Sequence, residues 1–312
     1  MNKIPEARAQ PGRDTHTRTS FVLLIGLSVV WGLNWPIMKI ALADFEPLTF
    51  RTLCIGAGAI GLAAIARAAG LSLAVPRREW KWLILASICN ILGWNIMVVY
   101  GLDMMAAGRS VILAYTMPLW GVILSAMFLH ERLTRRRGLG LVLGLCGLAV
   151  LMGSDIVDLQ ATPVGALLVI GAAISWAAGT VTVKYAKLTI PTTVLTAWQM
   201  IIGLGPVAIL ALIVDGGEPP TLNLWPTLAV VYNMVLAFNF SYWAWFRIVA
   251  EVPVGVAAIS TLVIPVIGLL AGAALLGEAI GVQELIALAL VVCALATALI
   301  PQGFLAWRRS WR

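Results

Sequence analysis

The chain has 312 residues, of which 61% are apolar, 11% are charged and 29 are glycine, and its mean hydropathy is +0.96. A soluble domain carries about 25% charged residues and about half apolar ones, so the polar residues here are too few to cover a folded surface in water. Composition therefore excludes a soluble protein and makes the lipid bilayer the solvent.

Long stretches without Asp, Glu, Lys or Arg follow one another along the chain. They are 19–38, 52–66, 82–102, 110–130, 138–154, 159–183, 188–214, 219–246, 252–277 and 285–307. An α-helix needs roughly 20 apolar residues to cross the hydrocarbon, and every stretch except 52–66 holds 17 or more. The first stretch is longer than the apolar core of a signal peptide, so we interpret it as an uncleaved span. The sequence predicts an all-α membrane protein with ten transmembrane helices.

The placement of charge predicts the orientation in the membrane. With the N-terminus inside, 17 of the 21 basic residues fall in cytoplasmic segments, whereas the outer loops carry mostly acids. Lys and Arg collect on the cytoplasmic side of membrane proteins, so both termini are expected in the cytoplasm. The net charge of +7 then mostly reflects topology rather than nucleic-acid binding, and the basic tail 1–18 is expected to be solvated rather than bound to anionic lipid.

The sequence contains an internal repeat. A shift of 147 residues places Gly108, Pro118 and Glu131 over residues of the same type, and a shift of 145 places Trp31…Lys39 over 176–184. We expect a basic tail (1–19), a first five-helix repeat (20–155), a second (163–303) and a C-terminal tail (304–312). Five is an odd number, so the second repeat enters the membrane inverted. Inverted repeats around a midplane site are typical of alternating-access transporters.

Several motifs resemble one transporter family. Residues 31–39, WGLNWPIMK, are similar to the opening W-G-x-N-[FW]-x-x-x-K of EamA-type members of the drug/metabolite transporter superfamily. Phe50-Arg51 and the segment from Pro118 to Thr134 (P…LHERLT) match that family's F-R and P…L-x-E-R-L-T, and the segment from Pro265 to Glu278 repeats the ending as P…LGE. Residues 279–281 depart from the E-R-L-T ending, and Trp198 stands where the first half has arginine. The resemblance implies a bacterial inner-membrane carrier, most like exporters of aromatic amino acids.

Polar and aromatic side chains inside spans mark a candidate cavity, because an unpaired polar group in hydrocarbon is costly and usually faces the bundle or water. In the first span Trp31, Asn34, Trp35 and Met38 share one helical face, and Asn90 and Trp94 share one in the third. The candidate substrate-binding residues are Trp31, Asn34, Trp35, Lys39, Asn90, Trp94, Tyr100, Trp176, Lys184, Trp198, Asn239 and Tyr242.

Ordinary structural roles compete with this interpretation. Asparagines in spans also clamp helices together, and aromatic residues near helix ends form interfacial belts. Lysine by default extends to the interface; a Lys39 facing the cavity would favour a substrate carboxylate. We expect Arg51 and Arg109 to fix helices or the outer rim. Pro118 and Pro265 fall mid-span at matching positions and are expected to kink paired helices.

Missing residue types narrow the mechanism. No span interior contains Asp or Glu, whereas proton-coupled pumps generally need a titratable group within the membrane. The four cysteines form no C-x-x-C pair and the two histidines are far apart in sequence, so neither a metal nor another cofactor is expected. We therefore expect facilitated transport that does not depend on a buried carboxylate.

The sequence thus predicts a monomeric carrier that exports small metabolites, amino acids with aromatic or hydrophobic side chains among them. The alternative within transport is a carrier of drugs or nucleoside-like metabolites, with proton coupling. A membrane-embedded enzyme is disfavoured, because no H-E-x-x-H, G-x-S-x-G or paired intramembrane carboxylates are present. A channel is disfavoured because selectivity filters are built from rings of groups, which a single two-fold repeat does not supply.

Overall fold

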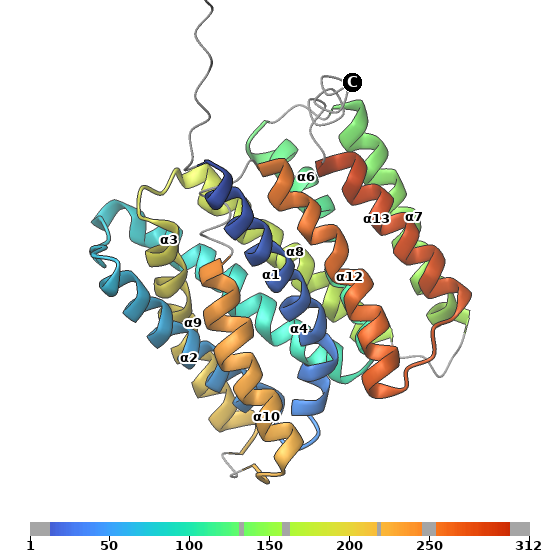
Figure 1. The fold of residues 1–312 in the computed structure, drawn as a ribbon, viewed down its shortest axis with the longest axis horizontal. Helices are drawn as coiled ribbons and strands as arrows, with labels where there is room; N and C mark the ends of the chain where they lie inside the picture. Colours follow the sequence, from blue (N-terminus) through green and yellow to red (C-terminus); the bar gives the residue numbers. More distant parts are fainter. Residues whose placement is uncertain (1–12, 131–133, 158–162, 217–219, 245–253, 300–312) are drawn as a thin grey trace, which may run out of the picture.

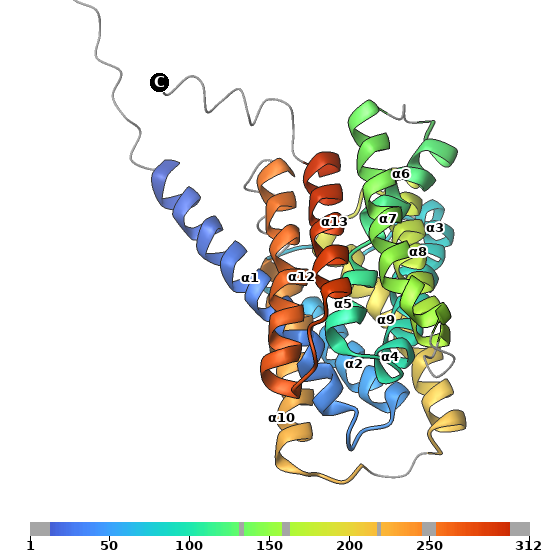
Figure 2. The same ribbon diagram turned by 90° about the vertical axis from the view of Figure 1, so that its right-hand side faces the viewer.

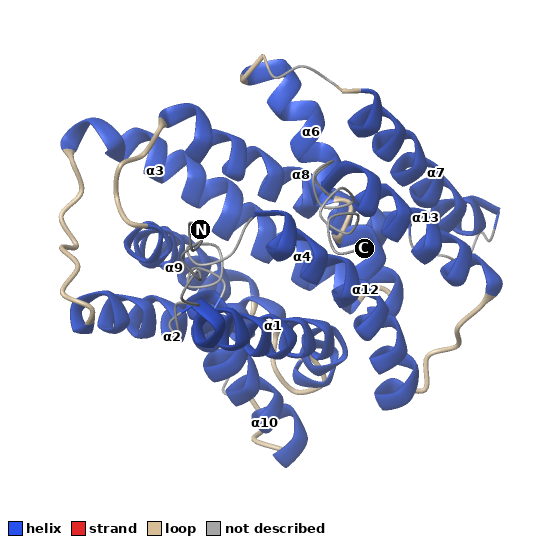
Figure 3. Ribbon diagram, turned by 45° about the horizontal axis from the view of Figure 1, so that its top comes forward, coloured by secondary structure: helices blue, strands red, loops and turns tan. Residues whose placement is uncertain are grey.

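The structure, a computed structural model, describes residues 13–130, 134–157, 163–216, 220–244 and 254–299. Within these ranges every regular element is helical and none is a strand (Figure 3). The longer helices are α1 (Arg13–Ala41), α2 (Pro47–Ala68), α6 (Met117–Phe128), α7 (Arg135–Val157), α8 (Pro163–Ala186), α9 (Thr192–Val214), α12 (Val254–Leu276) and α13 (Val282–Leu299). The shorter elements are η1 (Arg77–Glu79), α3 (Trp80–Ser87), η2 (Ile88–Gly93), α4 (Trp94–Asp103), α5 (Ala107–Ala114), α10 (Leu224–Tyr232) and η3 (Asn233–Phe240).

Membrane-spanning character is confirmed for much of the chain. Seven helical stretches are long and apolar enough to cross a bilayer: Val22–Ala41, Pro47–Ala68, Arg77–Asp103, Ala107–Phe128, Pro163–Ala186, Thr192–Val214 and Leu224–Ala244. Shorter apolar stretches at Gly138–Val150, Val263–Leu276 and Val282–Thr297 overlap the other three predicted spans. The count of ten spans stays a prediction.

Large apolar side chains cover the outside of the bundle. Ile60, Leu212 and Val22 are 75%, 70% and 69% exposed. Lipid tails solvate such groups without the penalty that water imposes. The interior is also apolar, and Phe50 and Met200 are fully buried in the main core cluster. The surface therefore suits a hydrocarbon environment, while the few buried polar groups stand out against an apolar interior.

Two kinds of interruption break the regular helices. The third span of each half contains a π-helical segment, η2 and η3, in which backbone hydrogen bonds run from i to i+5. The fourth span of the first half is divided: α5 ends at Ala114, and α6 begins at Met117 with Pro118 in its first turn. In the second half, α12 runs without a break through Pro265. The two prolines that the repeat aligns therefore lie in different local structures.

The two halves interlock across the bundle. The sequence repeat maps α1, α2, η2, α6 and α7 onto α8, α9, η3, α12 and α13. Two contacts join an element to its own counterpart, namely α2 with α9 and α7 with α13, and the latter pair lies at one edge of the molecule (Figures 1 and 2). The contact of α1 with α12 has its counterpart in that of α8 with α6. This is the contact pattern that exchange of the halves about a two-fold axis would produce.

Candidate functional site

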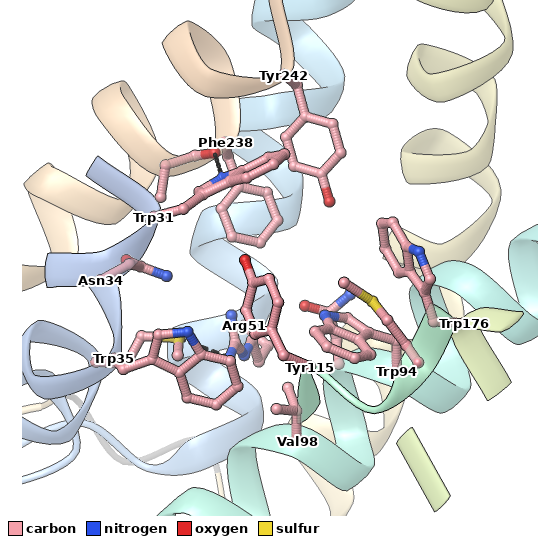
Figure 4. A pocket seen from close by; sticks show the side chains of 14 residues that line it. Trp31, Asn34, Trp35, Arg51, Trp94, Val98, Tyr115, Trp176, Phe238 and Tyr242 are labelled. Carbon is pink, nitrogen blue, oxygen red and sulfur yellow. Dashed lines mark hydrogen bonds between the residues drawn. The ribbon is translucent and has the colours of Figure 1, made fainter. Parts of the chain in front are cut away.

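A cavity of about 110 Å³ lies where the two halves meet (Figure 4). Its lining is dominated by aromatic rings, with two amides and one charged side chain among them. The lining residues are Trp31, Asn34, Trp35, Met38, Arg51, Trp94, Asn95, Val98, Tyr115 and Met117 from the first half, and Trp176, Ala237, Phe238 and Tyr242 from the second. Neither half encloses the cavity alone.

Aromatic contacts join the halves across the cavity. The rings of Trp94 and Trp176 have centroids 5.2 Å apart, and those of Trp31 and Tyr242 meet edge to face at 6.0 Å. The indole N–H of Trp31 also donates to the carbonyl of Ala237 at 3.4 Å. Offset and edge-to-face geometries stabilise aromatic pairs by about 0.5–1.5 kcal/mol beyond the burial of area. These pairs hold flat apolar surfaces around the space in which a ligand would lie.

The two π-helical segments shape this lining. η2 begins at Ile88 and η3 begins at Asn233, which is 145 residues later and matches the shift that relates the tryptophans. Trp94 directly follows η2, and Phe238 lies within η3. π-helical turns are rare and occur preferentially at functional sites. Their recurrence at one position of both halves connects the repeat to the cavity.

Among the described residues that line the cavity, Arg51 alone is charged, and it is only 2% exposed. Its Nη2 lies 3.0 Å from the sulfur of Met38, and its guanidinium lies 5.1 Å from the ring centroid of Phe50. Thioether sulfur is a weak acceptor, and the Nε of Arg51 has no hydrogen-bond partner among the described residues. The cavity therefore carries one buried positive charge. We expected Arg51 to fix helices or the rim, but the first turn of α2 is itself buried and carries the residue inward.

Tyr115 enters the cavity through the break between α5 and α6. It follows the last residue of α5, is 6% exposed and lies in the lining. In Figure 4 its hydroxyl and that of Tyr242 both face the enclosed space. Proline clashes with the preceding turn of a helix, so Pro118 was a usable signal for a break at this point. The sequence reasoning treated that proline as a kink and missed the tyrosine.

The structure brings half of the predicted site residues together. Trp31, Asn34, Trp35, Trp94, Trp176 and Tyr242 line the cavity, whereas Lys39, Asn90, Tyr100, Lys184, Trp198 and Asn239 lie outside its lining. Besides Arg51 and Tyr115, the sequence-based set omitted Met38, Asn95, Val98, Met117, Ala237 and Phe238. The three- and four-residue spacing had placed Met38 on the face of Trp31, Asn34 and Trp35, although it was not among the candidate binding residues.

Several predicted residues outside the lining hold helices together instead. The amide of Asn90 donates to Gln199 Oε1 at 3.0 Å, and that of Asn239 donates to the carbonyl of Ala57 at 3.1 Å. The indole of Trp198 donates to the carbonyl of Leu73 at 2.8 Å. The two asparagine contacts are interhelical, as polar side chains commonly make them within a membrane bundle, whereas Trp198 joins α9 to the loop that follows α2.

Lys39 also has partners in the backbone. Its ammonium donates to the carbonyl of Met105 and lies 3.5 Å from that of Leu102. Lys39 therefore donates to backbone carbonyls near the end of α4 and does not line the cavity. Lys184, its counterpart by the repeat, is exposed in the last turn of α8.

Two carboxylates near helix ends, Asp215 and Glu278, each accept two hydrogen bonds. Glu278 accepts from the backbone N–H groups of Ala107 and Gly108 at 2.7 and 2.9 Å, at the start of α5. Asp215 accepts from the N–H and hydroxyl of Thr49 at 2.6 and 2.8 Å. A carboxylate satisfies the free N–H groups and the positive end of a helix dipole. These acids therefore have structural partners away from the cavity.

The described residues contain no group of three or more His, Cys, Asp or Glu that could hold a metal ion. No acid occurs among the cavity-lining residues. What remains is an aromatic chamber with amides and one guanidinium, suited to holding an amphiphilic molecule. A helical bundle with an outward apolar surface and a chamber between duplicated halves defines an integral membrane transporter by its architecture.

The comparisons with known proteins agree with this class. The chain belongs to the EamA-like transporter family, which matches twice, over residues 18–153 and 163–300. The duplication inferred from the sequence and the family resemblance are both confirmed.

Two curated relatives cover nearly the whole chain. The transporter YoaV of Bacillus subtilis is 26% identical over 86% of this chain and 93% of its own length. A probable amino-acid metabolite efflux pump of Salmonella typhimurium is 24% identical over 89% of this chain and 94% of its own. A solved crystal structure shares the fold with a TM-score of 0.66 at 22% identity, covering 90% of this chain and 97% of the other.

Proposed function

We propose that this protein exports amino acids with aromatic or hydrophobic side chains across the bacterial inner membrane. The observation that carries the proposal is the chamber built from aromatic rings of both halves, with Trp94 against Trp176 and Trp31 against Tyr242. Flat apolar walls fit such side chains, and the amides of Asn34 and Asn95 supply hydrogen-bonding groups. A relative described as a probable amino-acid metabolite efflux pump supports the choice of substrate class and direction.

Transport proceeds by alternating access in this proposal. The halves are two inverted five-helix repeats, and their relative movement opens the chamber to one side of the membrane at a time. The exchange-related contacts of α1 with α12 and of α8 with α6 support this symmetry. The start of α1 and the end of α13 lie at the same end of the bundle, which is consistent with both termini in the cytoplasm (Figure 2).

Transport is facilitated rather than proton-driven in this proposal. A buried group that binds and releases a proton is the usual coupling device, and the chamber lining contains no carboxylate or histidine. Flux of labelled phenylalanine should therefore follow its own gradient and persist when an imposed pH difference is collapsed. Obligatory exchange of phenylalanine for protons would overturn this part of the proposal.

The substrate class is tested in proteoliposomes with labelled phenylalanine, tryptophan, leucine, lysine and glutamate. We expect saturable transport of the first three and little of the two charged amino acids. Trp94→Ala should raise the KM for phenylalanine, whereas Trp225→Ala, on a tryptophan that is 72% exposed in α10, should leave it unchanged. Failure of every amino acid to saturate transport, or saturable transport of a nucleoside or a cationic drug instead, would reject amino acids as the substrates.

A further inference from the structure

We infer that Arg51 is an anion site that makes a free carboxylate the required feature of the ligand, while the ammonium group of an amino acid is dispensable. The inference rests on the proposed function and defines its substrate class more narrowly. The ligands are then monocarboxylates with an aromatic or branched apolar body, and the zwitterionic amino acids form one subset of them.

The first step is the state of the guanidinium. Arg51 is 98% buried, and no carboxylate within the described residues pairs with it, whereas Arg109 lies 3.4 Å from Glu284. Among the described residues, the Nη2 of Arg51 faces only the weak sulfur acceptor of Met38, and the Nε of Arg51 has no hydrogen-bond partner. A buried charge without a counter-ion is strongly disfavoured unless a partner is supplied. Because Arg51 lines the cavity, a ligand can supply that partner.

The second step is the kind of anion. Guanidinium presents a planar fork of N–H donors that matches the two oxygens of a carboxylate. The described lining contains one such cation and no second charge, so a single negative charge is balanced and a doubly charged phosphate is not. The aromatic rings of Trp35 and Tyr115 lie beside Arg51 in Figure 4 and provide an apolar wall next to the anion site.

The third step concerns the ammonium group. No acid is among the described residues that line the cavity, so an ammonium would find no counter-ion among them. The side-chain oxygens of Asn34 and Asn95 have no hydrogen-bond partner among the described residues and can accept from it. Neutral acceptors recover only part of the hydration that a charged amine loses on burial. A ligand without the ammonium loses the hydrogen bonds to these amide oxygens but also avoids the cost of desolvating the amine. A ligand without the carboxylate leaves the buried charge of Arg51 without a counter-ion.

The experiment uses the full-length protein and four phenyl compounds of similar shape. These are phenylalanine, 3-phenylpropionate without the ammonium, phenylalaninamide without the carboxylate, and phenethylamine with the ammonium alone. Each competes with labelled phenylalanine in proteoliposomes, and each is also tested for thermal stabilisation of the purified protein in detergent. We expect 3-phenylpropionate to match phenylalanine within about threefold and the amide and amine to be at least about 30-fold weaker, the cost of leaving a buried charge unpaired.

Variants test the role of the guanidinium. Arg51→Gln should reduce the preference for acid over amide to within about threefold, while Arg51→Lys, which keeps the charge, should retain at least about fivefold preference. Arg67→Gln is the matched control, since Arg67 lies in the last turn of the same helix and is exposed, and it should preserve the full preference. The preference is a ratio, so it is measurable even where Arg51→Gln lowers protein yield.

The outcomes separate this inference from the proposed function. Saturable phenylalanine transport with equal competition by the amide would overturn the anion site and leave the amino-acid carrier intact. Acid-selective stabilisation lost in Arg51→Gln, together with no amino-acid transport, would support the anion site and reject the proposed substrates. An unchanged acid preference in Arg51→Gln, or the same loss in Arg51→Lys as in Arg51→Gln, would overturn the role assigned to the charge.

Discussion

Lys39 and Arg51 are both cations within the bundle, yet their surroundings differ. Lys39 lies at the end of α1 and donates to carbonyls at the end of α4, so its charge is used in the framework. Arg51 lies in the first turns of α2, faces the chamber and, within the part of the chain that the structure describes, meets no acceptor stronger than a thioether. In a membrane protein with few charges, the charged side chains that hold helices together have hydrogen-bond partners within the protein. The cation without a strong partner is therefore the better guide to a ligand site than the cation in the more recognisable motif.

The carboxylates also have structural partners, and the largest loss of stability is expected when one of them, Glu278, is removed. Glu278→Ala should lower the free energy of unfolding by about 2–4 kcal/mol, because two N–H groups at the start of α5 lose a charged acceptor. Thermal or denaturant unfolding in detergent measures the change. Asp103→Ala, which removes an exposed acid at the end of α4, is the control and should be close to neutral. An equally mild result for both variants would show that Glu278 has no special structural role.

The hydrogen bond from Asn90 to Gln199 also holds helices together, and it can be broken by a substitution that removes no polar group. A Cβ on Gly179 would lie 1.9 Å from the side-chain oxygen of Asn90, so Gly179→Ala must displace the amide that bonds Gln199. We expect a loss of stability of about 1–3 kcal/mol, the usual cost of overpacking. Gly205→Ala on α9 has open space around the new Cβ and is the matched control. A destabilisation no larger than in that control would place Asn90 in a looser environment than the structure does.

The chamber wall should respond in affinity more than in stability. Trp94→Phe keeps an aromatic face but loses part of the contact with Trp176, so affinity for phenylalanine should fall by about 0.5–1.5 kcal/mol. Competition in proteoliposomes measures this change. The same substitution at Trp82, which packs on Tyr185 outside the lining, should not alter affinity. Equal effects at the two positions would mean that the lining does not contact the substrate.

Lys39→Met should have the smallest effect on recognition. It removes donors from the carbonyls at the end of α4, so a stability loss of about 1 kcal/mol is expected. The KM for phenylalanine and the preference for acid over amide should stay at the wild-type values. A loss of acid preference as large as that in Arg51→Gln would reverse the roles assigned to the two cations.

The sequence predicted the helices and the duplication because both depend on composition and on repeated residue types. It also placed Trp31, Asn34 and Trp35 on the face that lines the chamber, since α1 is regular enough for three- and four-residue spacing to hold. The same spacing failed for Asn90 and Trp94. Trp94 lines the chamber, whereas the amide of Asn90 is held outside the lining by its hydrogen bond to Gln199 on α9.

Other features depended on tertiary context. The burial of Arg51 cannot be predicted from its position in the sequence. The first turn of α2 is buried because neighbouring helices pack against it, not because of its own composition. Pro118 indicated an irregularity in the fourth span, yet its counterpart Pro265 lies in an unbroken helix. Proline alone therefore does not decide between a kink and a break.

The paired π-helical segments also bear on how such a chamber can be altered. A turn that bonds from i to i+5 holds one residue more than an α-helical turn, and one residue corresponds to about 100° of rotation. Deleting a single residue within 88–93 would turn Trp94, Asn95 and Val98 away from their present direction, while the lining side chains on the other elements keep theirs. The segment 233–240 offers the second half the same adjustment independently. The shape of the chamber can thus be changed through helix length, without replacing any side chain in the wall.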